Sequence, residues 1–119
     1  MTYATSTITG TSSLANTRAY AYIFYNRSGS TFRVVGVSGE WQPTSGDVVS
    51  RREAEFGLVG GSYTYKSPTS NYFEVIDMTP VEFTPLLDNY ELNMSAVVTN
   101  NGISRTLRTY ASLNGSDLH

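Results

Sequence analysis

A two-residue alternation of side chains is most extended between Arg18 and Ser38, where the chain reads RAYAYIFYNRSGSTFRVVGVS. Two apolar runs flank a polar Asn-Arg-Ser-Gly segment at 26–29. Aromatic and β-branched residues fit the half-buried surface of a sheet, so the pattern predicts a β-hairpin that turns at these four residues and forms the centre of the fold. One face of the first strand then carries Tyr20, Tyr22 and Phe24, and the other carries Ala19, Ala21, Ile23 and Tyr25.

The predicted turn sets a register between the two strands. Closure around residues 26–29 pairs Ile23 with Phe32 on one face and Tyr22 with Arg33 on the other. Because tyrosine hydroxyls need water or hydrogen-bond partners, the face of Tyr22 is expected to be the wetter one. The first strand has few polar residues on either face, as a central strand or one that meets a partner would. The second strand is expected to oppose Phe32 and Val34 to Arg33, Val35 and Val37.

A second alternation runs from Tyr90 to Thr99 and is followed by Asn101-Gly102, a turn preferred in two-residue hairpins. Residues 84–96 and 103–114 also admit helices, because Thr84-Pro85 is a possible helix start and Asn114-Gly115 a possible helix end. The Asn-Gly pair and the threonine content favour strands. Folding about this turn pairs Ala96 with Leu107, Leu92 with Ala111, and Ser95 with Arg108.

Shorter strand-like segments occupy 62–66 and 72–78, and the segment 81–83 lies between two prolines that allow an edge strand or a helical turn. Residues 1–17 are rich in threonine and predict an edge strand or an extended arm. The 119 residues suffice for a single domain, 1–119, with its own core. We therefore predict an all-β fold, an antiparallel β-sandwich or small barrel of about seven to nine strands.

Charge and composition limit the partners of the chain. Charged residues make up 15% of it, below the roughly 25% usual in soluble domains, and the formal net charge is −2. This balance provides no broad attraction to nucleic acid or anionic membrane, and no transmembrane segment is visible. No signal peptide is visible either, which predicts a cytoplasmic protein, one released by a non-classical route, or part of a virus particle. There is no cysteine, which excludes disulfides.

Residues that carry most enzymatic chemistry are absent or unsuitably placed. The single histidine is His119, the last residue, and no Gly-x-Ser-x-Gly, phosphate-binding glycine loop or calcium loop occurs. Glu53 and Glu55 would share one face of a strand, about 7 Å apart. A glycosidase pair would also need a cleft and a raised pKa, and the adjacent Arg51 and Arg52 favour a solvated ion-pair cluster. We predict a protein that is not an enzyme and uses no cofactor or metal ion.

Trp41 is the only tryptophan and lies in 38–47, a Gly-, Ser- and Pro-containing segment that predicts a loop. An exposed tryptophan can stack on a sugar or enter a lipid interface, whereas a buried one would cover one end of the core. Four tyrosines are candidates for a second aromatic surface: Tyr20, Tyr22, Tyr63 and Tyr65. The predicted ligand-binding residues are Trp41, Asn26, Ser30, Tyr20, Tyr22 and Arg33.

The segment Tyr25–Phe32, YNRSGSTF, resembles the first strand turn of the streptavidin-type biotin binders, and Leu113–Asp117 resembles their last strand. The resemblance implies that Asn26, Ser30 and Asp117 contact a polar ligand. That family surrounds its ligand with several tryptophans, whereas this chain has one, outside the matched segments. The strand, Asn-x-Ser-Gly turn and strand are also similar to the start of the aegerolysin cytolysins, whose later Trp- and Gly-rich motifs are missing. The chain is assigned to neither family.

Two functional hypotheses follow. The first is a non-enzymatic binding protein that recognises a glycan or another neutral polar surface through Trp41, loop hydroxyls and tyrosines, as the low charge and the Ser, Thr, Gly, Asn and Tyr bias suggest. The second is a structural subunit of a self-assembling particle (a virion coat, decoration or tail protein), which the Thr-rich start and the apolar hairpin favour. The expected partners are a glycan, a protein surface or copies of the chain, and we expect a homo-oligomer.

Overall fold

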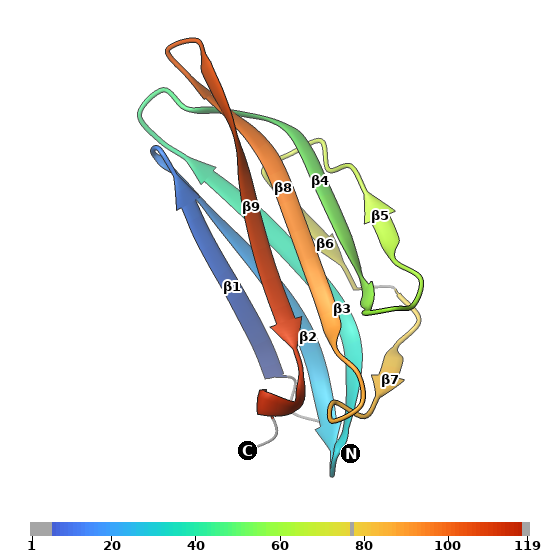
Figure 1. The fold of residues 1–119 in the computed structure, drawn as a ribbon. Coiled ribbons are helices and arrows are strands. Elements are labelled where there is room, and N and C mark those ends of the chain that lie inside the picture. Colours follow the sequence, from blue (N-terminus) through green and yellow to red (C-terminus); the bar gives the residue numbers. More distant parts are fainter. Residues whose placement is uncertain (1–5, 77, 118–119) are drawn as a thin grey trace.

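The computed structural model describes residues 6–76 and 78–117, and this part of the chain forms nine strands in two antiparallel sheets (Figure 1). Sheet A has the order β1-β2-β3-β6, with β7 on another part of β3, and sheet B has the order β5-β4-β8-β9. Their bounds are β1 (Ser6–Leu14), β2 (Thr17–Ser28), β3 (Thr31–Pro43), β4 (Val48–Leu58), β5 (Thr64–Lys66), β6 (Tyr72–Val75), β7 (Val81–Phe83), β8 (Tyr90–Asn100) and β9 (Ile103–Leu113). The predicted all-β sandwich is confirmed, and the sheets do not close into the alternative, a barrel.

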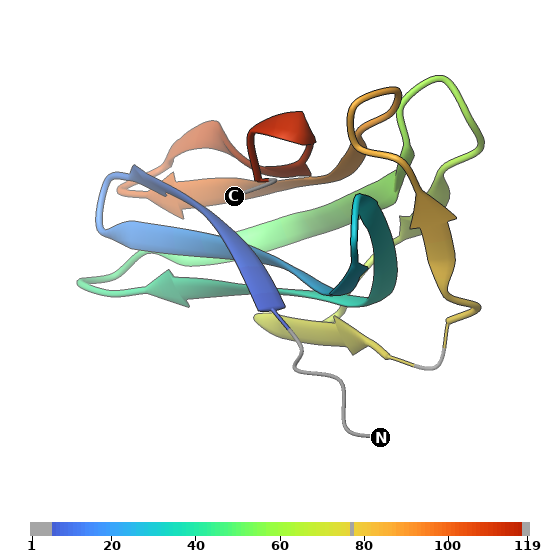
Figure 2. The same cartoon turned by 90° about the horizontal axis from the view of Figure 1, so that it is seen from below.

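The inner faces of the two sheets share one core of buried apolar side chains. Seen from below, β2 and β3 lie in one layer and β8 and β9 in the other (Figure 2). β8 buries every second residue from Tyr90 to Val98, as the alternation predicts. On β2 the buried residues are Ala19, Ala21, Ile23 and Tyr25, so the predicted faces of this strand are confirmed. Each large apolar side chain buried this way contributes about 1.5–3 kcal/mol, which stabilises the sandwich without disulfides.

The β2–β3 hairpin turns later than predicted. Ser28 pairs with Thr31, so the turn is Gly29-Ser30, and Gly29 has a φ of 59°, in the region that favours glycine. Residues 26–28 therefore extend β2 instead of forming the turn, and Asn26 pairs with Arg33. The predicted pairs Tyr22–Arg33 and Ile23–Phe32 are wrong for this reason.

A bulge in β3 changes which residues face the core. Phe24 pairs with Gly36 and Tyr25 with Val34, which leaves Val35 without a partner in the ladder between them. One additional residue reverses the faces of the residues that follow it. Val37 is consequently fully buried, although the uninterrupted alternation predicted it on the outer face.

The hairpin of β8 and β9 has the predicted register. Its three predicted pairs are all present, and Asn101 and Gly102 occupy the turn with φ values of 52° and 76°. Both turn positions need positive φ, which asparagine and glycine tolerate best. Residues 84–96 and 103–114 therefore form none of the helices that they also admitted: β8 and β9 occupy 90–96 and 103–113, and residues 84–89 form a turn and connection. The alternation reads correctly here because no bulge interrupts the β8–β9 pairing.

The peripheral segments are edge strands. Ser6–Leu14 pairs with β2 along its whole length, which selects the edge strand over the arm; residues 1–5 lie outside the described residues. Val81–Phe83 pairs with the start of β3, again as an edge strand. Within the segments predicted at 62–66 and 72–78, the strands β5 and β6 are shorter than the alternation suggests, and residue 77 is not described.

β1 also lies beside β9, where the edges of the two sheets approach each other (Figure 1). Ser12 Oγ donates a hydrogen bond to the Arg108 carbonyl oxygen at 2.8 Å and lies 2.7 Å from Thr109 Oγ1. A Cβ added at Gly10 would overlap the carbonyl oxygen of Tyr110. Glycine at this position therefore lets the two strands come into backbone contact.

Asp47, in the β3–β4 connection, bonds to residues beside the β1–β2 and β8–β9 turns, and Figure 1 shows these three connections at the same end of the sandwich. Its Oδ2 accepts hydrogen bonds from the Asn16 backbone N–H at 2.9 Å and the Thr17 hydroxyl at 2.7 Å. Its Oδ1 accepts one from Asn100 Nδ2 at 2.6 Å. These bonds, from Thr17 and Asn100 foremost, lower the pKa of the Asp47 carboxyl below its usual value.

Candidate functional site

The outer face of sheet A carries a row of three half-buried aromatic rings on β2. The ring planes of Tyr20 and Tyr22 are parallel within 7°, with centroids 6.3 Å apart. Those of Tyr22 and Phe24 are parallel within 9°, with centroids 6.4 Å apart. The spacing follows from the strand, because every second side chain points to the same face. Threonines of β1 flank the row, since Thr9 pairs with Tyr22.

Carboxylates hold two of the tyrosine hydroxyls on this face. Tyr22 donates a hydrogen bond to Glu40 Oε1 at 3.2 Å, and Tyr72 donates one to Glu74. Burial, followed by the bond to Glu40, raises the pKa of Tyr22 above its usual value of 10.0. For Tyr72 the bond to Glu74 is the larger cause of a raised pKa. Both phenols therefore stay neutral and keep their rings oriented near neutral pH.

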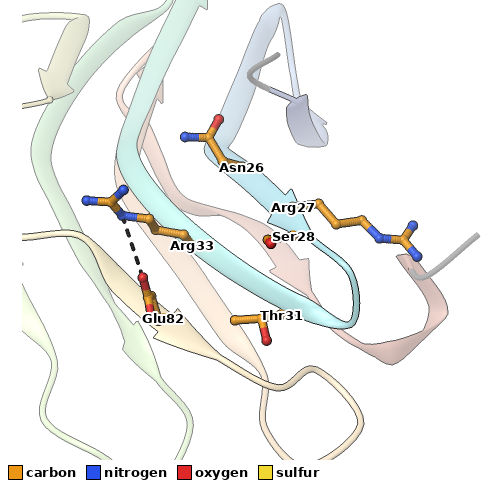
Figure 3. A pocket seen from close by; sticks show the side chains of 6 residues that line it. All are labelled: Asn26, Arg27, Ser28, Thr31, Arg33 and Glu82. Carbon is orange, nitrogen blue, oxygen red and sulfur yellow. Dashed lines mark ion pairs between the residues drawn. The ribbon is translucent and has the colours of Figure 1, made fainter. Parts of the chain in front are cut away.

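The aromatic row ends at a pocket of about 370 Å³ beside the β2–β3 turn (Figure 3). Cross-strand pairing explains its composition, because Asn26 pairs with Arg33, and Arg33 pairs with Glu82 of β7. Since they are direct partners, these three side chains point to the same outer face. The residues that line the pocket are Asn26, Arg27, Ser28, Thr31, Arg33 and Glu82.

Asn26, which lines the pocket, has a side-chain acceptor without a donor. Asn26 Oδ1 is fully buried and has no hydrogen-bond partner within the described residues. An unsatisfied buried polar atom costs about 1–3 kcal/mol, so such atoms are rare. Arg33 Nε lies 4.0 Å from Glu82 Oε1, and both side chains are exposed, so this ion pair is weak. Arg27 extends to the other side of the hairpin (Figure 3), and its Nε donates to the Gly29 carbonyl oxygen at 2.9 Å.

Four of the six predicted ligand-binding residues share this outer face. Tyr20 and Tyr22 belong to the aromatic row, and Asn26 and Arg33 line the pocket. Ser30 is exposed at the hairpin turn but does not line the pocket. The alternation of β2 is the signal that brings Tyr20, Tyr22 and Asn26 together; the pairing of Asn26 with Arg33 depends on the exact turn.

Trp41 does not lie on this or any other surface. It belongs to β3, is 2% exposed, and its ring centroid lies 6.0 Å from that of Phe73. The predicted loop at 38–47 is therefore wrong for its first six residues. Gly39 misled the prediction: a Cβ there would overlap Met94 and the Phe73 ring, so this glycine allows close packing between the sheets instead of a turn. Trp41 fits the alternative reading, a core residue.

Sequence reasoning missed a second groove, on the outer face of sheet B. It has a volume of about 530 Å³ and lies over β4, β5, β8 and β9. Tyr65 lines this groove, and Tyr63 donates a hydrogen bond to Glu91 of β8 in the same sheet. The prediction that these two tyrosines form one surface with Tyr20 and Tyr22 is therefore wrong. The outward residues that line it are Glu53, Glu55, Tyr65, Asn93, Ser95, Arg108 and Tyr110. The alternation of Tyr90–Thr99, which puts Asn93 and Ser95 outward, was the available signal.

Glu53 and Glu55 share the outer face of β4, as predicted. The arginines beside them behave differently from the predicted ion-pair cluster. Arg52 donates to Asn71 Oδ1 at 2.6 and 2.8 Å and to the Val49 carbonyl oxygen, instead of bonding the glutamates. Arg51 adopts a φ of 50° where the β4–β8 register shifts, so a bulge separates the arginines from the glutamates.

Neither face offers a metal centre in the part of the chain that the structure describes, since no group of three His, Cys, Asp or Glu residues converges there. His119 lies outside the described residues. Within the described ranges no helix has the length and apolar character to cross a membrane. No protein family, curated protein or solved structure matches the chain. The molecule is an antiparallel β-sandwich with a polar pocket at the end of an aromatic row on the outer face of sheet A, and a groove lined by Tyr65 and Tyr110 on the outer face of sheet B.

Proposed function

We propose that this protein is a non-enzymatic binding protein that recognises a glycan or a similarly neutral, hydroxyl-rich surface through the outer face of sheet A. The observation that carries the proposal is the buried, unpartnered Oδ1 of Asn26, a residue that lines a pocket at the end of a row of parallel aromatic rings. Trp41, buried in the core, has no part in this recognition.

The chemistry of the face matches a sugar. Aromatic rings bind apolar C–H faces, and the hydroxyl of Tyr22, the middle ring of the row, is already engaged with a carboxylate. A ligand hydroxyl that uncovers Asn26 Oδ1 can donate to it, because no donor among the described residues does so. Arg33 and Glu82 offer donors and an acceptor of opposite charge side by side, so their charges cancel, while the third charged lining residue, Arg27, extends to the other side of the hairpin; a neutral ligand is therefore favoured.

The test uses a change that separates binding from stability. Asn26→Ala removes an acceptor that the fold leaves unsatisfied, so the variant should be as stable as the wild type or more stable, by up to about 1–3 kcal/mol. Its binding on a glycan array, and its affinity for the best ligand by calorimetry, should fall about tenfold or more. Ser30→Ala, at the exposed turn outside the pocket, is the matched control and should leave both quantities unchanged.

A wild-type protein that binds nothing on the array would contradict the proposal. So would an Asn26→Ala variant that binds normally but unfolds more easily, because the asparagine would then serve the fold alone.

A second candidate function, a structural subunit of an assembly, is supported by exposed aliphatic side chains. Leu86 and Leu87, adjacent in the β7–β8 connection, are 73% and 86% exposed. Exposed apolar groups of this kind are characteristic of protein contacts when they form a patch. The mass in solution tests it: light scattering should show an oligomer that dissociates in Leu86→Ser/Leu87→Ser. A stable monomer at high concentration would count against assembly and leave the binding proposal intact.

A further inference from the structure

The outer face of sheet B has an aromatic rim that hydrogen bonds hold in place. Tyr65 donates to Glu53 Oε1 at 3.0 Å and accepts from Ser67 Oγ at 3.1 Å. On the other side of the groove, Tyr110 donates to Glu91 Oε1 at 3.0 Å. Both rings are more than half exposed, at 57% and 51%. Large exposed rings that are already oriented lose little conformational entropy when a ligand contacts them.

Tyr63 strengthens this arrangement from the β4–β5 connection. Its hydroxyl donates to Glu91 Oε2 at 3.3 Å, so Glu91 holds one tyrosine on each carboxylate oxygen. Burial, and then the charge of Glu91, raise the pKa of Tyr63 above its usual value. The phenol of Tyr63 therefore stays neutral near neutral pH, and the shift reflects the negative charge of the neighbouring carboxylates.

Between the rims, the floor of the groove keeps its polar groups available. Glu55 pairs with Tyr65 on one side and Asn93 on the other, and Asn93 pairs with Tyr110. In the next row Ser95 lies between Glu53 and Arg108. The side chains of Glu55, Asn93 and Arg108 make no hydrogen bond or ion pair within the described residues. Acceptors and donors are thus both present and both unoccupied.

The charge of this face is unbalanced. Glu53, Glu55 and Glu91 contribute −3 and Arg108 contributes +1, so the local net charge is −2. A positively charged ligand is attracted to such a surface. Arg108 in the floor opposes a densely cationic peptide, but its guanidinium can donate to hydroxyl or ring oxygens.

We infer that the outer face of sheet B is a second binding site, specific for an oligosaccharide that carries free, protonated amines. The sugar rings pack on Tyr65 and Tyr110, an ammonium group binds Glu55, and hydroxyls bind Asn93, Ser95 and Arg108. The site shares no residue with the sheet A pocket, so it does not depend on the function proposed for that pocket.

Calorimetry of the whole chain at pH 6 tests this inference with three probes. They are a glucosamine hexamer, its fully N-acetylated counterpart and hexalysine. The glucosamine hexamer should bind at least tenfold more tightly than either of the others, because only it combines amines with sugar rings. Its affinity should fall as salt is added, since part of the attraction is electrostatic.

Three variants locate the site. Glu55 is exposed, and its side chain makes no hydrogen bond or ion pair among the described residues, so Glu55→Gln should fold normally and weaken hexamer binding about tenfold. Tyr110→Ala should weaken it to a similar degree by removing one rim. Asp88→Asn removes the same charge from the β7–β8 connection, outside the sheet A pocket and the sheet B groove, and should have no effect.

The inference fails if the N-acetylated hexamer binds as tightly as the free amine, or if hexalysine does. It also fails if Glu55→Gln and Asp88→Asn have equal effects, which would show attraction to net charge alone. Failure of the sheet A proposal appears in a different variant, Asn26→Ala, so the two outcomes are separable.

Discussion

Asp47 is a single side chain that holds three turns together by hydrogen bonds to its two carboxylate oxygens. Asp47→Asn should lower the free energy of unfolding at pH 7, because the amide cannot accept at both atoms. The folded pKa of Asp47 lies below its usual value of 3.8, so its stabilisation is fully present above that pH and is lost as the pH falls through the folded pKa. Urea unfolding should show a higher free energy of unfolding for the wild type than for the variant at pH 7. The two values should converge as the pH falls below 4 and through the folded pKa of Asp47.

Asp88→Asn is the control for this prediction, because the Asp88 carboxylate accepts no hydrogen bond from the described residues. A difference between wild type and Asp47→Asn that persists unchanged at low pH would mean that the charge of Asp47 contributes nothing.

A second prediction at the residue scale concerns the buried side chain of Trp41. Its indole is buried against Phe73, so Trp41→Ala should cost about 3–5 kcal/mol of unfolding free energy. The intrinsic fluorescence should be blue-shifted and resist quenching by acrylamide until the protein unfolds. Efficient quenching in the native state would place Trp41 on the surface and restore it as a ligand-binding residue.

At the scale of elements, the contact between β1 and β9 depends on Gly10. A Cβ at this position meets the Tyr110 backbone, which cannot rotate away as a side chain can. Gly10→Ala should therefore push the two strands apart and cost about 1–3 kcal/mol. Gly61→Ala, where the nearest atom lies 3.4 Å from the added Cβ, should change stability little. Urea unfolding compares the two variants, and equal stabilities would mean that β1 does not pack closely on β9.

The two hairpins show why elements of equal clarity were predicted with unequal success. Asn101-Gly102 is a turn whose two residues both suit positive φ, and its strands carry no bulge. In the β2–β3 hairpin, three polar residues precede Gly29, and composition alone assigned them to the turn. In the tertiary structure residues 26–28 continue β2 and pair with residues 31–33 of β3. β7 pairs with the same part of β3 on its other side.

For the whole molecule, the shape predicts two independent binding faces. The sandwich measures 50 × 29 × 26 Å, and its core separates the sheet A pocket from the sheet B groove. Saturating one face with its ligand should leave unchanged the dissociation constant of the other ligand at the opposite face, because the two sites have no lining residue in common. Calorimetry with the first ligand in excess measures this. A change of about fivefold or more would reveal coupling through the core.

The candidate site divides between what could be predicted and what could not. The alternation of β2 alone placed Tyr20 and Tyr22 on one outward face, and Asn26 and Arg33 were selected as well. The sheet B groove was missed because its members come from four strands, and no local pattern reveals that Tyr65 lies across from Glu55 while Arg108 lies two strands away. Only the pairing of distant strands creates it.

The amino-acid sequence by itself determined the all-β class, the faces of β2 and β8, and the register of the last hairpin. These follow from a period of two and from turn residues with distinct φ preferences, both of which are local. The tertiary structure decided the bulge at Val35, the burial of Trp41 and the two opposite faces of the sandwich. Each depends on which strands pair and which sheets pack together. The sequence alone does not distinguish a glycine in a turn from one, such as Gly39, that allows a close contact between sheets.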